Sequence, residues 1–141
     1  TSAKHGYEWA TVDRGLEVLH LIVASGLRPD LDCYRYLFQI AAEDCWQGLL
    51  SHERVRQLYE AMKKEEGVTP DIDVINSVLE CTAGLAQYNL TTLADGQALF
   101  NDCVEFGIEP DLVSWAGLLD ILMGEIEYGT ASARKVEGVL A

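Results

Sequence analysis

The sequence lacks the features that mark several common protein classes. No stretch approaches the roughly 18–20 uncharged apolar residues that cross a membrane, and the longest apolar run covers only residues 19–27. The first ten residues contain no initiator Met, basic leader or apolar signal core, as expected of a mature or trimmed product. The four cysteines form neither a CxxC pair nor a Cys/His ligand spacing. This favours small apolar core residues in a reducing compartment over a disulfide scaffold or a zinc site.

Signals of catalysis are also missing from the sequence. The three histidines have no ligand-spaced partner, and neither a nucleophile motif nor a phosphate-cradling glycine loop occurs. We therefore expect a protein that is not an enzyme and that uses no cofactor and no metal.

Positive charge is scarce and unevenly distributed. The chain has 10 Lys and Arg against 23 Asp and Glu, which gives a formal net charge of −13. Residues 72–111 contain seven acidic residues and no Lys or Arg. Because nucleic acids are bound largely by cations that displace counterions from phosphates, this segment would repel an RNA backbone. The charge favours a basic protein partner over a continuous RNA track.

Proline is equally scarce, and its three positions form a repeat. Pro29, Pro70 and Pro110 each stand three residues after a glycine and directly before an aspartate, in GLRPD, GVTPD and GIEPD. A period of 40 or 41 residues marks a repeat architecture. The glycine suits the left-handed residue after a helix, and proline cannot continue that helix. The aspartate, or the residue two positions later, can cap the next helix.

Apolar residues fall at helical spacing on both sides of each turn. The helix expected after each turn, helix A, has three apolar stripes: Tyr34, Leu37, Phe38 and Ala41; Ile75, Val78, Leu79 and Thr82; and Trp115, Leu118, Leu119 and Leu122. The helix expected before each turn, helix B, has three more: Val12, Leu16, Leu19 and Val23; Val55, Leu58, Tyr59 and Met62; and Leu93, Leu99, Phe100 and Cys103. A last helix B is expected to begin within residues 130–141.

No strand pattern competes with these helices, since alternating apolar and polar residues are absent. We therefore expect an all-α protein, an α-solenoid of stacked antiparallel helical hairpins. The expected units are a partial repeat over residues 1–30, repeats over 31–71 and 72–111, and a partial repeat over 112–141.

The segments that join helix A to helix B, residues 43–53 and 83–95, are long for a helical hairpin. Each holds either an extra helical turn or a surface loop. Trp46 and Tyr88 lie in these segments and either fold back onto the hairpin or contact a partner.

Three phrases of the sequence resemble the pentatricopeptide repeat family, whose unit ends in a pattern such as ALxLFxxMxxxGxxPD. They are GLEVLHLIVASGLRPD (residues 15–30), VRQLYEAMKKEEGVTPD (55–71) and QALFNDCVEFGIEPD (97–111). Tyr34 and Trp115 occupy the aromatic position that follows in the family's helix A. The units are longer than usual for the family, and the A-to-B segments account for the excess.

The resemblance implies an α-solenoid of a mitochondrion or chloroplast that grips single-stranded RNA, one base per repeat. In the family, a polar residue early in helix A and the last residue of the same unit read the base. The corresponding residues here are Asn76 with Asp111 in the second unit and Arg35 with Asp71 in the first. The third unit offers Ala116, which has no hydrogen-bonding side chain.

Two functions remain open at this point. The chain is either a protein-docking scaffold, such as a subunit of a larger organellar assembly, or a module that binds single-stranded RNA. The scaffold is favoured because only Asn76 and Asp111 form a usual base-reading pair, and their unit has no cation. The two functions differ in where the cations should lie, since RNA binding requires Arg35, Arg54 and Arg56 to gather on the surface of the A helices.

Overall fold

The structure of this protein is a computed structural model that describes residues 11–140, with side chains up to residue 129. These residues form six helices and no strand, which confirms the all-α prediction for the described part of the chain. The helices are α2 (Thr11–Ala24), α3 (Leu31–Trp46), α4 (His52–Lys64), α5 (Ile72–Ala86), α6 (Leu93–Phe106) and α7 (Leu112–Leu140).

The three Gly-x-x-Pro-Asp segments are turns that end one helix and cap the next. Gly26, Gly67 and Gly107 adopt positive φ angles of 84°, 80° and 71°, the left-handed conformation that an L side chain rarely tolerates. Asp30 and Asp71 are the N-caps of α3 and α5, and each carboxylate accepts a hydrogen bond from the backbone N–H three residues later. Asp111 does the same for the N–H of Ser114. The aspartate directly after proline is therefore the cap in all three turns.

The other two connections are shorter than the sequence suggested, because helices cover both ends of each predicted segment. Only residues 47–51 lie between α3 and α4, and only residues 87–92 lie between α5 and α6. Trp46 is the last residue of α3, so it lies in an extra helical turn and not in a loop. Gly48 and Asn89 reverse the chain with φ angles of 73° and 60°. Ser51 then caps α4 through the N–H of Arg54.

The separate helix B predicted within residues 130–141 is wrong for residues 130–140, which continue α7 without a break; Ala141 lies outside the described residues. In the two preceding hairpins the second helix gains a partner by folding back, since α4 packs on α5 and α6 packs on α7. Most of a short helix's stability comes from such tertiary packing. Residues 130–140 contain no proline that would end α7.

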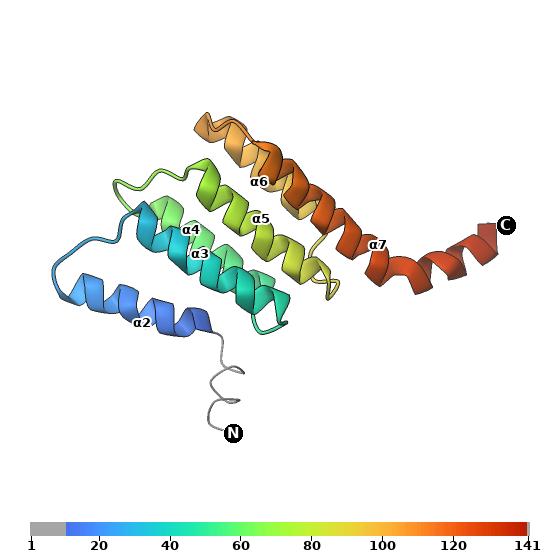
Figure 1. The fold of residues 1–141 in the computed structure, drawn as a ribbon, viewed down its shortest axis with the longest axis horizontal. Coiled ribbons are helices and arrows are strands. Elements are labelled where there is room, and N and C mark those ends of the chain that lie inside the picture. Colours follow the sequence, from blue (N-terminus) through green and yellow to red (C-terminus); the bar gives the residue numbers. More distant parts are fainter. Residues whose placement is uncertain (1–10, 141) are drawn as a thin grey trace, which may run out of the picture.

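The helices lie in two layers, and α3, α5 and α7 run side by side in the same direction (Figure 1). Helix α5 is in the middle and contacts both α3 and α7, while α4 and α6 lie behind this row. The hydrophobic core lies between the layers. Its largest fully buried side chains are Phe38, Met62, Ile75, Leu79, Leu85 and Ile121.

Two of the three stripes predicted for the A helices are buried, and the third is buried only in part. All four residues of the α3 stripe and all four of the α5 stripe are buried. On α7, Leu118 packs against the core and Leu122 is half-buried, but Trp115 and Leu119 are 55% and 66% exposed, so the prediction is wrong for these two. The physical reason is that no described helix runs parallel to α7 on this side; Trp115 meets α6 through an edge-to-face contact with Phe100. On α2 the predicted stripe also fails at its end, where Val23 is 56% exposed.

Candidate functional site

The structure brings the predicted pair Asn76 and Asp111 together. The Asn76 Nδ2 donates a hydrogen bond of 3.1 Å to the Asp111 Oδ1, and the Asn76 Oδ1 accepts one of 2.6 Å from the Ser114 hydroxyl. The pKa of Asp111 lies below its usual range, mainly because its carboxylate accepts the backbone N–H of Ser114 and also because Asn76 donates to it. These polar groups form a closed network in the unliganded chain. A base would have to use the second amide hydrogen of Asn76 and the other oxygen of Asp111.

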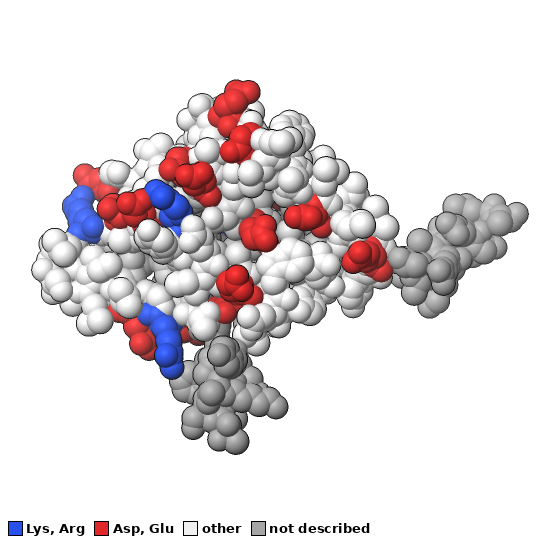
Figure 2. Space-filling view, in the orientation of Figure 1, with Lys and Arg blue, Asp and Glu red and all other residues white. Residues whose placement is uncertain are grey.

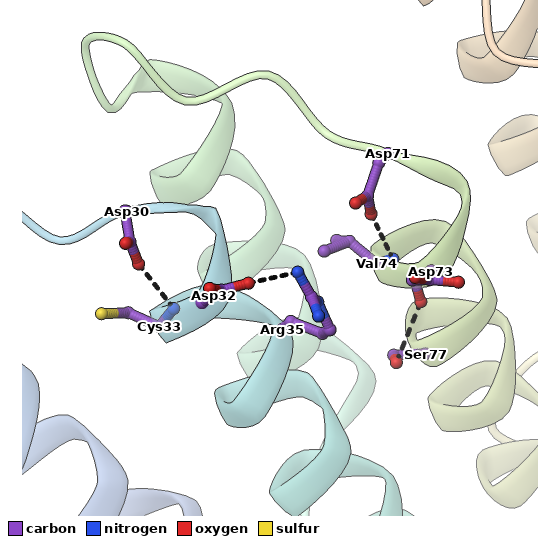
Figure 3. A network of polar contacts seen from close by, with 8 residues as sticks. All are labelled: Asp30, Asp32, Cys33, Arg35, Asp71, Asp73, Val74 and Ser77. Atoms are coloured by element: carbon purple, nitrogen blue, oxygen red, sulfur yellow. Dashed lines mark hydrogen bonds and ion pairs between the residues drawn. The ribbon is translucent and has the colours of Figure 1, made fainter.

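The structure does not join the other predicted pair, Arg35 and Asp71 (Figure 3). The Arg35 guanidinium forms an ion pair with Asp32 on its own helix, and the Asp71 carboxylate accepts the backbone N–H of Val74 at 3.0 Å. Arg35 Nε is buried and is the one buried side-chain nitrogen or oxygen without a hydrogen bond among the described residues. Each member of this pair thus has a local structural role.

Trp46 and Tyr88 connect the ends of α3 and α5 while remaining partly accessible, at 37% and 41% exposure. The Trp46 Nε1 donates to the Glu80 carboxylate at 3.1 Å, and the Tyr88 hydroxyl donates to the backbone carbonyl of Trp46 at 2.8 Å. Both aromatics therefore fold back onto their hairpins and still present an edge to solvent.

The side of the molecule formed by α3, α5 and α7 is acidic (Figure 2). Asp and Glu side chains are spread across this face, and the Lys and Arg side chains visible in this view lie on its left, toward α2 and the start of α3. In the sequence, residues 31–46, 72–86 and 112–129 contain one Lys or Arg, which is Arg35. The exposed acidic residues of these helix segments are Asp32, Glu43, Asp73, Glu80, Asp120 and Glu127.

Three of these carboxylates approach one another and form what we call the acidic patch, Glu43 of α3, Glu80 of α5 and Asp120 of α7. The pKa of Glu80 is raised, first because the side chain is partly desolvated and further because Asp120 and Glu43 repel its negative charge. The hydrogen bond from Trp46 opposes this shift without cancelling it. A cation placed here would relieve the repulsion.

The described cations do not gather on this face. Five of them pair with carboxylates, most of them on or beside α2 and α4: Arg28 with Glu66, Arg35 with Asp32, Arg54 with Asp13, Arg56 with Glu53, and Lys63 with Glu60. The arrangement that RNA binding requires of Arg35, Arg54 and Arg56 is therefore absent from the described residues.

The acidic patch was not identified from the sequence, although the repeat contains a signal for it. Glu80 and Asp120 both stand nine residues after the capping aspartate of their helix, and Glu43 stands thirteen after Asp30. Residues at equivalent places in parallel neighbouring helices lie side by side. Superimposing the units would have aligned Glu80 with Asp120, and a helical projection would have added Glu43.

Titratable and nucleophilic side chains also lie elsewhere in the described chain. A cavity of about 230 Å³ lies between α4, α5 and α6, lined in part by His52 and Asp95, whose Nε2 and Oδ1 are 4.0 Å apart. All four thiols are free, and burial raises the pKa of Cys81 and Cys103, which keeps these sulfurs protonated. Among the side chains that the structure describes, residues 11–129, no three of His, Cys, Asp or Glu are grouped as metal ligands.

No described helix combines the length and the apolar character needed to cross a membrane. No protein-family model matches the chain, and no curated protein matches it either.

Proposed function

We propose that this chain is a segment of an α-solenoid of the pentatricopeptide type and acts as a non-catalytic scaffold that docks a basic segment of a protein partner. The partner would lie along the face of α3, α5 and α7, within a larger organellar assembly. The observation that carries the proposal is the charge of this face, where six exposed carboxylates accompany a single arginine that is already paired.

Equivalent contacts at the α2–α3 and α6–α7 junctions support the solenoid part of the proposal. Asp44 of α3 accepts the backbone N–H of Val12 at the start of α2 at 2.9 Å. Glu125 of α7 accepts the backbone N–H of Leu93 at the start of α6 at 3.1 Å. Both carboxylates stand fourteen residues after the capping aspartate of their helix, where α5 has Leu85. The same contact thus occurs at two of the three junctions, as expected of stacked units.

The acidic patch and its neighbour Trp46 favour a cationic ligand. A lysine or arginine side chain would relieve the repulsion from Asp120 and Glu43 that adds to partial desolvation in raising the pKa of Glu80. Its alkyl stem or guanidinium plane would pack against the exposed part of the Trp46 indole. An RNA phosphate would meet repulsion at the same place.

The test is calorimetric titration of the full chain with a synthetic peptide rich in Lys and Arg, at low and at high salt. We expect salt-sensitive binding that weakens severalfold in Glu80→Gln and in Asp120→Asn. Glu53→Gln on α4 is the matched control, because it removes the same charge from an exposed side chain away from this face. Equal weakening by all three substitutions would indicate attraction to net charge alone and contradict the proposal.

A second candidate function, binding of single-stranded RNA, is favoured by one observation, the 3.1 Å contact between Asn76 and Asp111. Titration with a short uridine-rich RNA at low salt tests it. Saturable binding that is lost in Asn76→Ala and kept in Glu80→Gln would replace the scaffold by the RNA-binding function. Absence of RNA binding at low salt would remove this second candidate.

A further inference from the structure

The outer side of α7 carries a row of exposed apolar side chains. Trp115, Leu119, Met123 and Ile126 are 55%, 66%, 55% and 56% exposed, and they follow one another at helical spacing of three or four residues. Four large apolar side chains in one row exceed the scattered exposure that is normal on a protein surface, and such rows mark interaction sites.

The same four places are buried in the two helices that precede α7. Counted from the capping aspartate, they correspond on α5 to Ile75, Leu79, Ala83 and Ala86, all at most 1% exposed. On α3 they correspond to Tyr34, Phe38, Ala42 and Cys45, all at most 6% exposed. The α3 row lies next to α5, since Cys81 and Gly84 of α5 lie against Phe38 and Cys45. The α5 row lies next to α7, since Gly117 and Gly124 of α7 lie against Leu79 and Ala86. The outer row of α7 is therefore built like two rows that each receive a parallel helix.

The helices that cover these two rows, α5 and α7, each have a glycine at the point where their backbone comes nearest to the covered helix. A Cβ atom added to Gly84 of α5 would lie 2.9 Å from the backbone nitrogen of Trp46 on α3. One added to Gly124 of α7 would lie 3.1 Å from the backbone carbon of Ala86 on α5. Gly84 and Gly124 both stand thirteen residues after the capping aspartate. The α3–α5 and α5–α7 junctions thus have a glycine at the equivalent position, packed against the equivalent part of the preceding parallel helix.

A second small residue stands seven positions earlier in each covering helix. Gly117 packs on Leu79, where an added Cβ would lie 3.2 Å from the leucine Cβ, and Ser77 holds the equivalent place on α5. Two small residues seven apart lie on one side of a helix. They leave room for the bulky residues of the neighbouring row.

Helices α3, α5 and α7 of a second copy of this chain do not supply such a helix. The equivalent residues of α3 are Tyr36 and Glu43, a large aromatic side chain that is 61% exposed and an exposed carboxylate. They would hold α3 of another copy away from Leu119 and Met123. The small residues of α5 and α7 already face neighbours within their own chain.

We propose that the outer row of α7 docks one amphipathic helix of a partner protein, parallel to α7 and with Gly or Ser at two positions seven residues apart. This surface is separate from the acidic face and uses apolar packing in place of charge. The partner helix would pack on α7 in the same way that α5 packs on α3 and α7 packs on α5.

The probe that tests this is a peptide copy of residues 112–128 in which Leu119, Met123 and Ile126 are replaced by Gln. It keeps Gly117, Ile121 and Gly124, the side that already packs on α5. A lactam bridge on its polar side holds it helical, because an isolated helix of this length is only marginally stable. The matched control peptide carries Leu at both glycine positions.

Amide chemical shifts of the isotope-labelled full chain report where each peptide binds. We expect saturable shifts confined to α7 with the first peptide and binding about tenfold weaker or more with the control, equivalent to about 1.4 kcal/mol. Met123→Asp in the chain should cause a similar loss. Val104→Asp, at an 80% exposed apolar residue of α6, should leave binding unchanged.

Three outcomes would overturn the proposal. The first is no saturable binding of the glycine peptide, and the second is equal binding of the two peptides, which would indicate a non-specific apolar surface. The third is self-association of the full chain in sedimentation that Met123→Asp abolishes, because the outer row would then be occupied by a second copy.

Discussion

Helices α5 and α7 begin in the same way and end up in different surroundings. Each follows a Gly-x-x-Pro-Asp turn, and each packs on the preceding helix of its row through a glycine. Helix α5 is covered on both sides, so Leu79 is 1% exposed, whereas Leu119 at the equivalent place on α7 is 66% exposed. The repeat therefore encodes which residues share a side of the helix, and the neighbouring helix decides whether that side is buried.

The largest effect expected from this comparison concerns the two leucines. Leu79→Ala should lower the free energy of unfolding by about 2–5 kcal/mol, because it removes buried methyl groups and leaves a cavity between α5 and its neighbours. Leu119→Ala should change it by less than about 0.5 kcal/mol, as is usual at exposed positions. Urea unfolding followed by circular dichroism measures both. Similar losses in the two variants would mean that α7 is covered in solution.

A smaller difference is expected between two glycines. Gly84→Ala places a Cβ against the backbone of Trp46, which cannot move aside as a flexible side chain can, and should cost about 1–3 kcal/mol. Gly129→Ala in α7 meets nothing within 4 Å and should stabilise the helix by up to about 1 kcal/mol. Thermal unfolding midpoints of the two variants compare them directly. A gain in stability for Gly84→Ala would argue against close packing of α5 on α3.

The third comparison is between Asp44 of α3 and Glu125 of α7. These carboxylates cap α2 and α6 and lie on the two outer helices of the row formed by α3, α5 and α7. Asp44 is 2% exposed and accepts hydrogen bonds from the Thr11 hydroxyl at 2.6 Å and the Val12 N–H at 2.9 Å. Asp44→Ala leaves two donors without a partner and should cost about 1–3 kcal/mol. Glu125→Ala frees only the Leu93 N–H and should cost about 0.5–1 kcal/mol.

Amide hydrogen exchange at the first turn of α2 and of α6 measures these effects locally. Each substitution should speed exchange in the helix that its carboxylate caps and leave the other helix protected. Faster exchange in both helices from either variant would show that the two junctions are not independent.

Much of the fold was accessible from the sequence because its signals are local. A glycine with positive φ, a proline and a capping aspartate act within five residues, so all three turns were predicted correctly. The burial of Trp115 depends on a neighbour that local patterns do not contain, and the prediction failed there. The continuation of α7 past Gly129 was also missed, because the apolar pattern of residues 130–140 fits a continued helix as well as a new one.

The features of the candidate site also differ in whether the sequence alone could predict them. The pairing of Asn76 with Asp111 follows from their places in the repeat and was predictable. The ion pair of Arg35 with Asp32 competes with any contact to Asp71 and depends on side-chain conformation. The acidic patch arises only when three parallel helices are set side by side, so it required the structure.

The smallest effect expected from the comparison is a pH dependence of opposite sign at two carboxylates, one on α5 and one at the start of α7. Glu80 has a raised pKa in the folded chain, so its contribution to stability is present below its unfolded pKa and lost as the pH rises through the folded value. Asp111 has a lowered pKa, so its contribution is present above its unfolded pKa and lost as the pH falls through the folded value.

The two charge-removing variants separate these contributions when urea midpoints are measured between about pH 3 and about pH 7. The stability of Glu80→Gln relative to the parent should increase with pH, because the variant escapes the cost of partly desolvating a charged carboxylate and the repulsion from Asp120 and Glu43. The stability of Asp111→Asn relative to the parent should decrease with pH, because the parent gains the hydrogen bonds of an ionised cap. Parallel pH profiles for the two variants would mean that both carboxylates respond to the net charge of −13 and not to their own neighbours. In that case we would no longer expect the acidic patch to bind a cation more strongly than the rest of the surface does.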